Sequence, residues 1–408
     1  MKAWRVVLLV FLFMVINYAD KAIIGLSSVP IMHDLGLSSL QFGELGSAFF
    51  LLFSASGVVV GFLANHVRTK PLMLCLALAW GIALVPVGFS SGFGLLLASR
   101  ITLGAAEGPS FPVAIHALYK WFGDRQRALP TSIVACGAAF GTGVIAPLLT
   151  WLIVHHGWRA AFVTLGVTGM AWAAVWYLTT EEGPIGAAPA PPGVAAGGVP
   201  YRRLILCRTT LGILAAGFAA YWVIALNITW LANYLVKAVH LTPAAAAWIV
   251  GLPSVMQMLV APLLALISQS LTARGVSTRI SRGVLGGLCV VTAGTSMVCM
   301  SVVQFGILEV CLIGLTFSVG GVIFTLGPTL IGEITPPPQR GALLGLTNSF
   351  HTLAGLCAPV VMGFFLDRAP DPGAGFRSGF FYAGLLIAGL GMLAALLIEP
   401  EADKRRFR

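Results

Sequence analysis

The chain has 408 residues, of which 58% are hydrophobic and only 9% are charged, and its formal net charge is +10. Soluble domains carry about 25% charged residues, so this composition excludes a water-soluble fold of this length. The excess apolar surface must be covered by lipid.

Apolar segments long enough to cross a bilayer follow one another along the whole chain. A transmembrane helix needs about 20 apolar residues to span a hydrocarbon layer of ~30 Å. The pattern therefore predicts an all-α integral membrane protein with twelve transmembrane helices. They lie near residues 4–24, 42–64, 71–89, 93–118, 128–154 and 161–178 in the first half, and near residues 209–236, 244–267, 284–303, 305–331, 343–366 and 378–398 in the second.

A segment rich in Pro, Gly and Ala separates the sixth predicted helix from the seventh. This composition predicts a flexible linker. We therefore predict an N-terminal six-helix bundle over residues 1–179, a cytoplasmic linker over 180–208, a C-terminal six-helix bundle over 209–398 and a basic cytoplasmic tail over 399–408. Two such bundles suit alternating access, in which a site near the middle of the membrane opens to one side at a time.

The positive charge predicts the orientation of the chain. If both termini lie in the cytoplasm, 18 of the 24 Lys and Arg residues fall on the cytoplasmic side, loop by loop. This bias is typical of the positive-inside rule, and it predicts a multi-pass protein of the inner (cytoplasmic) membrane. We interpret the basic tail as a topology anchor that is attracted to anionic lipids, and we expect no nucleic-acid partner.

Four ionisable residues inside predicted helices are candidates for function, because each costs roughly 2.5–3.5 kcal/mol to insert into a membrane. Asp20 and Lys21 lie in the first helix, and Arg100 and Glu107 lie two turns apart on one face of the fourth. If the helices face one cavity, Arg100 and Lys21 would hold a carboxylate ligand. Asp20 and Glu107, shielded from water, could then take and release a proton. The alternative is structural pairing of Asp20 with Arg100, or of Lys21 with Glu107.

Polar residues in the second half of the chain are neutral. Asn348 and His351 lie three residues apart on one face of the eleventh predicted helix, and Tyr221 lies in the seventh. Neutral donors and aromatic rings suit the hydroxylated or ring part of an organic acid. For Asn227 and Gln257, hydrogen bonding between helices explains the residues equally well.

Motifs for nucleotide or metal chemistry are absent from the sequence. It contains neither a G-x-x-x-x-G-K-[ST] loop nor an H-E-x-x-H motif, and its seven cysteines are scattered singly. We therefore expect no cofactor, no metal site and no catalytic residues, so the protein is not predicted to be an enzyme.

Three segments carry a resemblance to a known family. NYADK (residues 17–21), ASRITLGAAEGPSFPVAIHALYKWF (98–122) and DRQRA (124–128) resemble the major facilitator superfamily, and more narrowly its anion:cation symporter family. The pattern R-x-x-x-G-x-x-E-x-P-x-F-P begins at Arg100 and includes Glu107. GLTNSFHTLAGLCAP (345–359) resembles the family's eleventh helix. The similarity covers essentially the whole chain.

The resemblance implies roles for individual residues. Arg100 and Lys21 would hold the substrate carboxylate, Asp20 and Glu107 would couple protons, and Tyr18 would line the cavity. Asn348 stands where the family has an Asn that contacts substrate. The implied fold is two six-helix bundles, and the implied protein is a monomer.

The chain also departs from the family pattern. Lys21 stands where Arg is usual, Ala138 where a Gln is often found and Phe53 where a Tyr is often found; the last two changes indicate a less hydroxylated substrate than a sugar acid. In the gating loop that contains Arg68, Asn65 replaces the usual Asp. Gln269 stands at the equivalent place in the second half, so we expect both gates to rest on neutral hydrogen bonds.

The sequence thus predicts a secondary active transporter that carries a small organic anion, a carboxylate, together with protons by alternating access. Its predicted partners are the anion, protons and the lipid bilayer. The alternatives are an anion exchanger or exporter of the same fold and, from a different class, a membrane sensor that does not transport.

Overall fold

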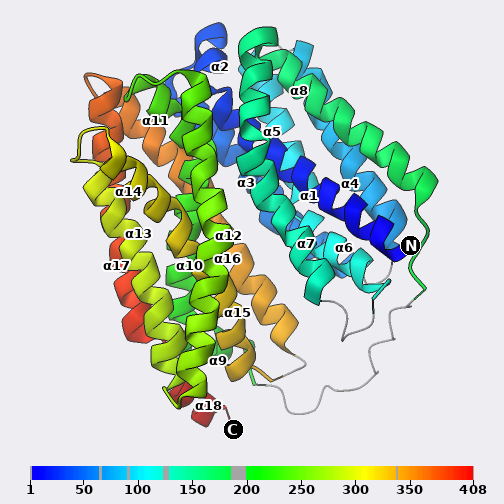
Figure 1. Cartoon of the computed structure of the whole chain (residues 1–408). Helices are drawn as coiled ribbons and strands as arrows, with labels where there is room; N and C mark the ends of the chain where they lie inside the picture. Colours follow the sequence, from blue (N-terminus) through cyan, green and yellow to red (C-terminus); the bar gives the residue numbers. More distant parts are fainter. Residues whose placement is uncertain are drawn as a thin grey trace. The chain divides into compact units, whose positions relative to one another are not determined.

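The computed structural model describes residues 2–63, 67–89, 92–122, 128–184, 199–336 and 339–407. The regular structure of these residues is helical, which confirms the predicted all-α class (Figure 1). The helices up to residue 184 are α1 (Lys2–Leu26), α2 (Ser28–Leu35), α3 (Ser39–Leu63), α4 (Thr69–Leu84), η1 (Val85–Phe89), α5 (Phe93–Glu107), α6 (Ser110–Tyr119), α7 (Ala128–Ala139), η3 (Phe140–Val144) and α8 (Ala146–Thr179).

The helices after residue 198 continue the same pattern. They are α9 (Tyr201–Ile205), α10 (Arg208–Leu226), η4 (Asn227–Leu231), α11 (Ala232–Lys237), α12 (Pro243–Ala273), η5 (Arg279–Val284), α13 (Leu285–Met300), α14 (Ile307–Ser318), η6 (Val319–Val322), α15 (Ile323–Ile334), α16 (Arg340–Arg368), α17 (Pro372–Leu397) and α18 (Pro400–Arg406). The short helices α2, α9 and α18 were not among the predicted elements. Residues 185–198 of the predicted linker lie outside the described residues.

Ten helical stretches of the described residues are long and apolar enough to cross a membrane. The longest, Ile133–Thr179, covers two of the predicted transmembrane helices. Within it Gly157 has φ 83° and ψ 159°, a backbone conformation that only glycine adopts readily, and it interrupts α8 near the predicted boundary. The predicted helix near residues 93–118 is formed by α5 and α6, each shorter than 18 residues.

Large apolar side chains lie on the outside of several helices. Ile82 is 68% exposed, and α12 exposes Trp248, Leu259, Leu263 and Leu266, the first two at 71%. A soluble protein could not present such a helix face to water, whereas lipid covers it without cost. The outward apolar surface agrees with the membrane location that the composition predicts.

Contacts divide the chain into two compact units. The first unit contains residues 1–188, 227–251 and 359–367, and the second contains residues 189–226, 252–358 and 368–408. Three long helical stretches, in α10–α11, α12 and α16, therefore contribute residues to both units. The predicted division into bundles of residues 1–179 and 209–398 follows the sequence order of the spans and stays a prediction.

In the first unit α1 packs against α7 and α8 (Figure 1). Phe13, in the middle of α1, is completely buried between the rings of Trp80 and Trp172, with ring centroids 4.4 Å and 4.8 Å away. The segments that follow residues 226 and 358 pack into the same unit. There the indole of Trp230 donates a hydrogen bond of 2.9 Å to the carbonyl oxygen of Pro359, and the Asp367 carboxylate accepts hydrogen bonds from the first backbone N–H groups of α3.

The second unit is held together by closely packed glycines and by carboxylates at helix ends. Helices α13 and α17 approach through Gly294 and Gly384, whose backbones leave no room for a side chain. Asp403 of α18 accepts a hydrogen bond of 2.8 Å from the Thr209 backbone N–H at the start of α10. Glu333 pairs with Arg282 at 3.3 Å.

Helices α3 and α5 of the first unit touch backbone to backbone. A Cβ atom placed on Gly104 would overlap the carbonyl oxygen of Phe49, so only glycine fits at this crossing. The break that follows is also a consequence of sequence, because Pro109 has no N–H group to donate to the preceding turn, although Gly108 before it keeps a helical backbone. Helix α5 therefore ends at Glu107, with Gly104 one turn earlier.

We expect Gly104→Ala to lower the free energy of unfolding by about 1–3 kcal/mol, because α3 and α5 must separate to admit the methyl group. Gly94→Ala in the same helix is the matched control, since a Cβ at Gly94 meets nothing within 4 Å. The control should be neutral or slightly stabilising, because alanine favours helix over glycine. Thermal unfolding of the purified variants in detergent measures the difference, and equal midpoints would contradict it.

Glu182, just after α8, caps the N-terminus of α4. Its carboxylate accepts hydrogen bonds from the backbone N–H groups of Thr69 and Lys70 and from the Thr69 hydroxyl, and it pairs with Lys120. Partial burial raises the pKa of Glu182, but the hydrogen bonds from Lys120, Lys70 and Thr69 outweigh it and lower the pKa from 4.5 to about 2. The charged carboxylate therefore stabilises the folded state.

Glu182→Gln should reduce stability at pH 7 by about 1–2 kcal/mol after allowance for solvent screening. Because the pKa is lower in the folded state, the stabilisation is complete above pH 4.5 and disappears as the pH falls towards 2. The variant and the wild type should therefore converge in acid. Glu181→Gln is the control, since Glu181 is 68% exposed in its ion pair with Lys2. Equal unfolding midpoints for both variants at pH 7 would refute the assignment.

Candidate functional site

The first unit contains a buried ion pair between α1 and α5. The ammonium nitrogen of Lys21 lies 2.6 Å from Oε2 of Glu107, and the two side chains are 8% and 0% exposed. Lys21 also donates a hydrogen bond of 2.5 Å to Oδ1 of Asn17, one turn earlier in α1. Of the two pairings that the sequence left open for these charges, the structure therefore contains the one between Lys21 and Glu107.

Arg100 of α5 lies in the same region and is 2% exposed. Its Nε and Nη1 atoms are buried and have no hydrogen-bond acceptor among the residues that the structure describes. The guanidinium carbon lies 4.9 Å from the ring centroid of Phe49 in α3. The cation is thus enclosed by protein while its Nε and Nη1 donors are unused.

Asp20 of α1 is completely buried, and neither carboxylate oxygen has a hydrogen-bond donor in the described part of the chain. It interacts electrostatically with Glu107, Lys21 and Arg100. No ion pair within 4.0 Å joins Asp20 to Arg100, although both residues are described. Four buried charges, two of each sign, thus share one region, and two of them lack direct partners.

Aromatic rings surround the cations of this region. The Lys21 ammonium lies 4.4 Å from the ring centroid of Tyr18, 5.7 Å from that of Phe53 and 5.9 Å from that of Phe49. Phe49 and Phe53 are themselves in contact, with centroids 5.4 Å apart. Tyr18, predicted to line a cavity, therefore lies beside Lys21, and Phe49 and Phe53 add two apolar rings to the same region.

The chemical capacity of this arrangement follows from its charges. With both carboxylates ionised, the charges of the four groups sum to zero. Each proton added to Asp20 or Glu107 then leaves one buried cation without a compensating negative charge. An isolated buried cation is unfavourable unless an anion pairs with it. Protonation of this cluster and binding of an anion therefore favour each other.

Two candidate residues of the second unit, Tyr221 and His351, lie near Phe324. The ring centroid of Phe324 lies 6.2 Å from that of Tyr221 and 6.0 Å from that of His351. Nε2 of the buried His351 lies 3.1 Å from the carbonyl oxygen of Ile213. Asn348, one turn from His351, is exposed. His351 is thus engaged with the backbone of a neighbouring helix, whereas Asn348 is accessible.

The gating-loop candidates are only partly described. Asn65 lies outside the described residues, as do Asp124, Arg125 and Arg127 of the DRQRA segment. Arg68 precedes α4 and is exposed, and Gln269 near the end of α12 is exposed. Their predicted roles stay predictions.

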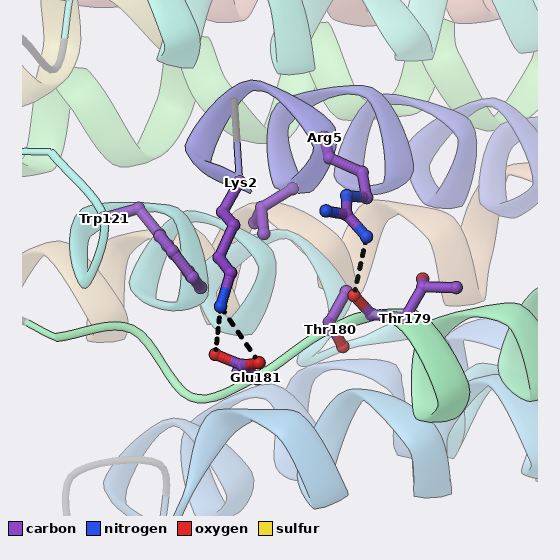
Figure 2. Close-up of a pocket in the computed structure, with 7 residues that line it drawn as sticks. Lys2, Arg5, Trp121, Thr179, Thr180 and Glu181 are labelled. Carbon is purple, nitrogen blue, oxygen red and sulfur yellow. Dashed lines mark hydrogen bonds and ion pairs between the residues drawn. The ribbon is translucent and has the colours of Figure 1, made fainter.

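A small cavity of about 50 Å³ lies elsewhere in the first unit (Figure 2). Lys2, Arg5, Trp121 and Glu181 line it together with neighbouring residues, and Lys2 pairs with Glu181 at 3.0 Å. Both side chains of that pair are more than 60% exposed. Because none of the four buried charges lines this cavity, we assign it no part in the candidate site.

Sequence reasoning gave no role to Asn17 or Phe49, although both contact the cations. Asn17 could have been found, since it precedes Lys21 by four residues, the spacing at which helical side chains meet. Phe49 had no comparable signal, because it is one of many apolar residues in α3. Groups of three or more His, Cys, Asp or Glu residues that could hold a metal ion do not occur in the described ranges.

Comparisons with known proteins place these features in a family. The family model described as Major Facilitator Superfamily matches residues 10–318 and 213–408. The chain is 27% identical to the probable sulfoacetate transporter of Cupriavidus necator over 94% of its own length and 91% of that protein. It is 25% identical to the probable galactarate/D-glucarate transporter of Bacillus subtilis, covering 97% and 90%, and 25% identical to the hexuronate transporter of the same organism, covering 96% and 93%.

Solved structures share the fold. A bacterial homolog to the human lysosomal transporter Spinster, in an inward-facing and occupied conformation, superposes with a TM-score of 0.82 at 18% identity, over 100% of this chain and 98% of that one. At this identity the likeness concerns the fold alone.

Proposed function

Because the chain belongs to the Major Facilitator Superfamily, a family of membrane transporters and not of enzymes, we propose that it is a proton-coupled symporter of a small organic anion. Transport would proceed by alternating access in the inner membrane, and the protein would act as a monomer. The observation that carries this proposal is the buried cluster of Asp20, Lys21, Arg100 and Glu107, in which the Nε and Nη1 donors of Arg100 are unused.

Two steps follow from the contacts of the cluster. In the first, a proton on Glu107 weakens its attraction for Lys21 and leaves the ammonium without its anionic partner, which lies 2.6 Å away. In the second, a substrate carboxylate or sulfonate takes that place and accepts hydrogen bonds from Arg100 as well. Asp20, buried beside both cations, is the second proton-coupling group. Release of the substrate on the other side lets Glu107 ionise again.

We propose that the topology has twelve spans in two six-helix bundles, with both termini in the cytoplasm. Ten of these spans are the ten long apolar helices, and two observations support the other two. The non-helical Gly157 divides Ile133–Thr179 into two spans, and α5 and α6 together are long enough for one. The orientation rests on the distribution of Lys and Arg.

The remaining candidates keep their proposed roles in the second half. Tyr221, Asn348 and His351 would contribute to substrate binding, with the exposed Asn348 the most accessible of the three. Arg68 and Gln269 would act in the gating loops, together with Asn65.

The relatives and two apolar residues indicate which organic anions are preferred. The relatives are named for sulfoacetate, galactarate or glucarate, and hexuronate. Phe53 lies 5.7 Å from Lys21 and offers no hydrogen bond to a hydroxyl group, and Ala138 likewise has no polar side chain. We therefore propose that a short anion with few hydroxyl groups, such as sulfoacetate, is preferred over galactarate.

The test is uptake of radiolabelled sulfoacetate, galactarate and D-glucuronate into proteoliposomes with an imposed pH gradient, acidic outside. Symport predicts accumulation that collapses when a protonophore removes the gradient. An exchanger would instead show counterflow of labelled anion without any response to the gradient, and a sensor would show neither. If none of the three anions is transported or bound, the proposal of an organic-anion site is wrong.

A further inference from the structure

The ring of Phe49 lies against both cations of the site. Its centroid is 4.9 Å from the guanidinium carbon of Arg100 and 5.9 Å from the ammonium nitrogen of Lys21. Phe49 is 2% exposed, so water does not weaken these interactions. The face of an aromatic ring carries partial negative charge and attracts a cation most strongly where water is excluded.

Arg100 has an unusual environment for a buried guanidinium. Buried cations are normally held by carboxylates or carbonyl groups that accept their N–H donors. Here Nε and Nη1 have no acceptor within the described ranges, and the nearest carboxylates leave them unpaired. The guanidinium carbon instead lies over the face of the Phe49 ring, 4.9 Å from the ring centroid. Because a phenyl ring has no oxygen or nitrogen acceptor, it attracts the cation without occupying the N–H donors as a carboxylate would.

Backbone packing fixes the ring at this place. Gly104 lies four residues after Arg100 on α5, and its Cα faces the carbonyl oxygen of Phe49. Gly108 meets the carbonyl oxygen of Phe53 in the same way one turn further on. The two glycines thus bring α3 and α5 to backbone contact at the residues whose rings face Arg100 and Lys21. The position of Phe49 relative to Arg100 is therefore set by rigid helices.

We propose that Phe49 is a positioning residue of the anion site. It holds Arg100 by the face of its ring, without accepting a hydrogen bond, so that the donors of Arg100 stay directed to the substrate anion. A carboxylate in its place would compete with the substrate for those donors. This inference rests on the proposed function for its effect on transport, but the contact itself can be tested without a substrate.

Three variants separate positioning from packing. Phe49→Leu keeps an apolar side chain and removes the ring, and Phe49→Tyr keeps the ring. Phe13→Leu is the matched control, because Phe13 is a fully buried aromatic residue of the same unit that packs against Trp80 and Trp172. In sulfoacetate uptake, Phe49→Leu should raise KM about tenfold with a smaller change in kcat. Phe49→Tyr should stay within about twofold of wild type, and Phe13→Leu should leave KM unchanged.

The second readout needs no substrate. In protein labelled with nitrogen-15 arginine, the Nε–H signal of Arg100 can be assigned from its loss in Arg100→Lys. A ring over the guanidinium shifts this signal, so Phe49→Leu should move it, whereas Phe49→Tyr and Phe13→Leu should not. A signal that stays in place in Phe49→Leu overturns the inference, and so does a KM change equal to that of Phe13→Leu. If the wild type transports no anion while the signal moves as expected, the proposed function fails and the positioning of Arg100 by Phe49 stands.

Discussion

Arg100→Lys should lower kcat/KM for anion uptake about a hundredfold. Arginine presents two parallel donors to a carboxylate or sulfonate, and lysine offers a single, more strongly hydrated point charge. Losing one or two charge-assisted hydrogen bonds corresponds to about 3 kcal/mol. Lysine would also lie less favourably against the ring of Phe49, whose centroid is 4.9 Å from the guanidinium. The measurement is initial uptake of sulfoacetate into proteoliposomes that contain equal amounts of folded protein.

Arg159→Lys is the control for this substitution. Arg159 lies in the same unit, pairs with Asp34 at 3.1 Å and rests on the ring of Trp158 at 4.2 Å, but its side chain is 35% exposed. A general intolerance of lysine would lower uptake in both variants, whereas a binding role lowers it in Arg100→Lys alone. Uptake within threefold of wild type in Arg100→Lys would remove Arg100 from the site.

Glu107→Gln should abolish accumulation driven by the pH gradient and preserve exchange of anion for anion. Glutamine has the shape of glutamic acid but cannot release a proton, so the cycle loses its coupling step. Lys21, which lies 2.6 Å from Oε2 in the wild type, loses its ionised partner and becomes available to the anion at every pH. We expect accumulation to fall at least tenfold, while counterflow without a gradient stays within a few-fold of wild type.

The same substitution should change the pH dependence of anion binding. In the wild type, acidification protonates Glu107 and frees Lys21, so affinity for the anion should rise as the pH falls. In Glu107→Gln this rise should be smaller, because only Asp20 still titrates at the site. Glu181→Gln serves as the control, since this exposed carboxylate pairs with Lys2 away from the site. Gradient-driven accumulation by Glu107→Gln at the wild-type level would show that the coupling group lies elsewhere.

The sequence was informative about the charged residues because the membrane makes each of them costly. Asp20, Lys21, Arg100 and Glu107 stand out against apolar helices, and the spacing of Arg100 and Glu107 places them on one face. Which charges pair could not be predicted, because pairing depends on the rotation of α1 against α5. The structure pairs Lys21 with Glu107 and leaves Asp20 and Arg100 without a direct partner.

Apolar residues carried no such signal. Phe49 is one of many hydrophobic residues in α3, and its place over Arg100 follows from the backbone contact at Gly104, which only the folded structure contains. The short helices α2, α9 and α18 escaped prediction for a related reason. They have eight residues or fewer, so they lack the long apolar runs from which membrane helices were predicted.

The number of protons taken up per anion bound tests the central claim most directly. It can be obtained by titrating the purified protein with sulfoacetate in a calorimeter, in buffers of different ionisation enthalpy. If protonation of Glu107 frees Lys21 for the anion, binding to the wild type should be accompanied by uptake of about one proton more than binding to Glu107→Gln. Binding without proton uptake in the wild type, or with the same uptake in both proteins, would contradict the account.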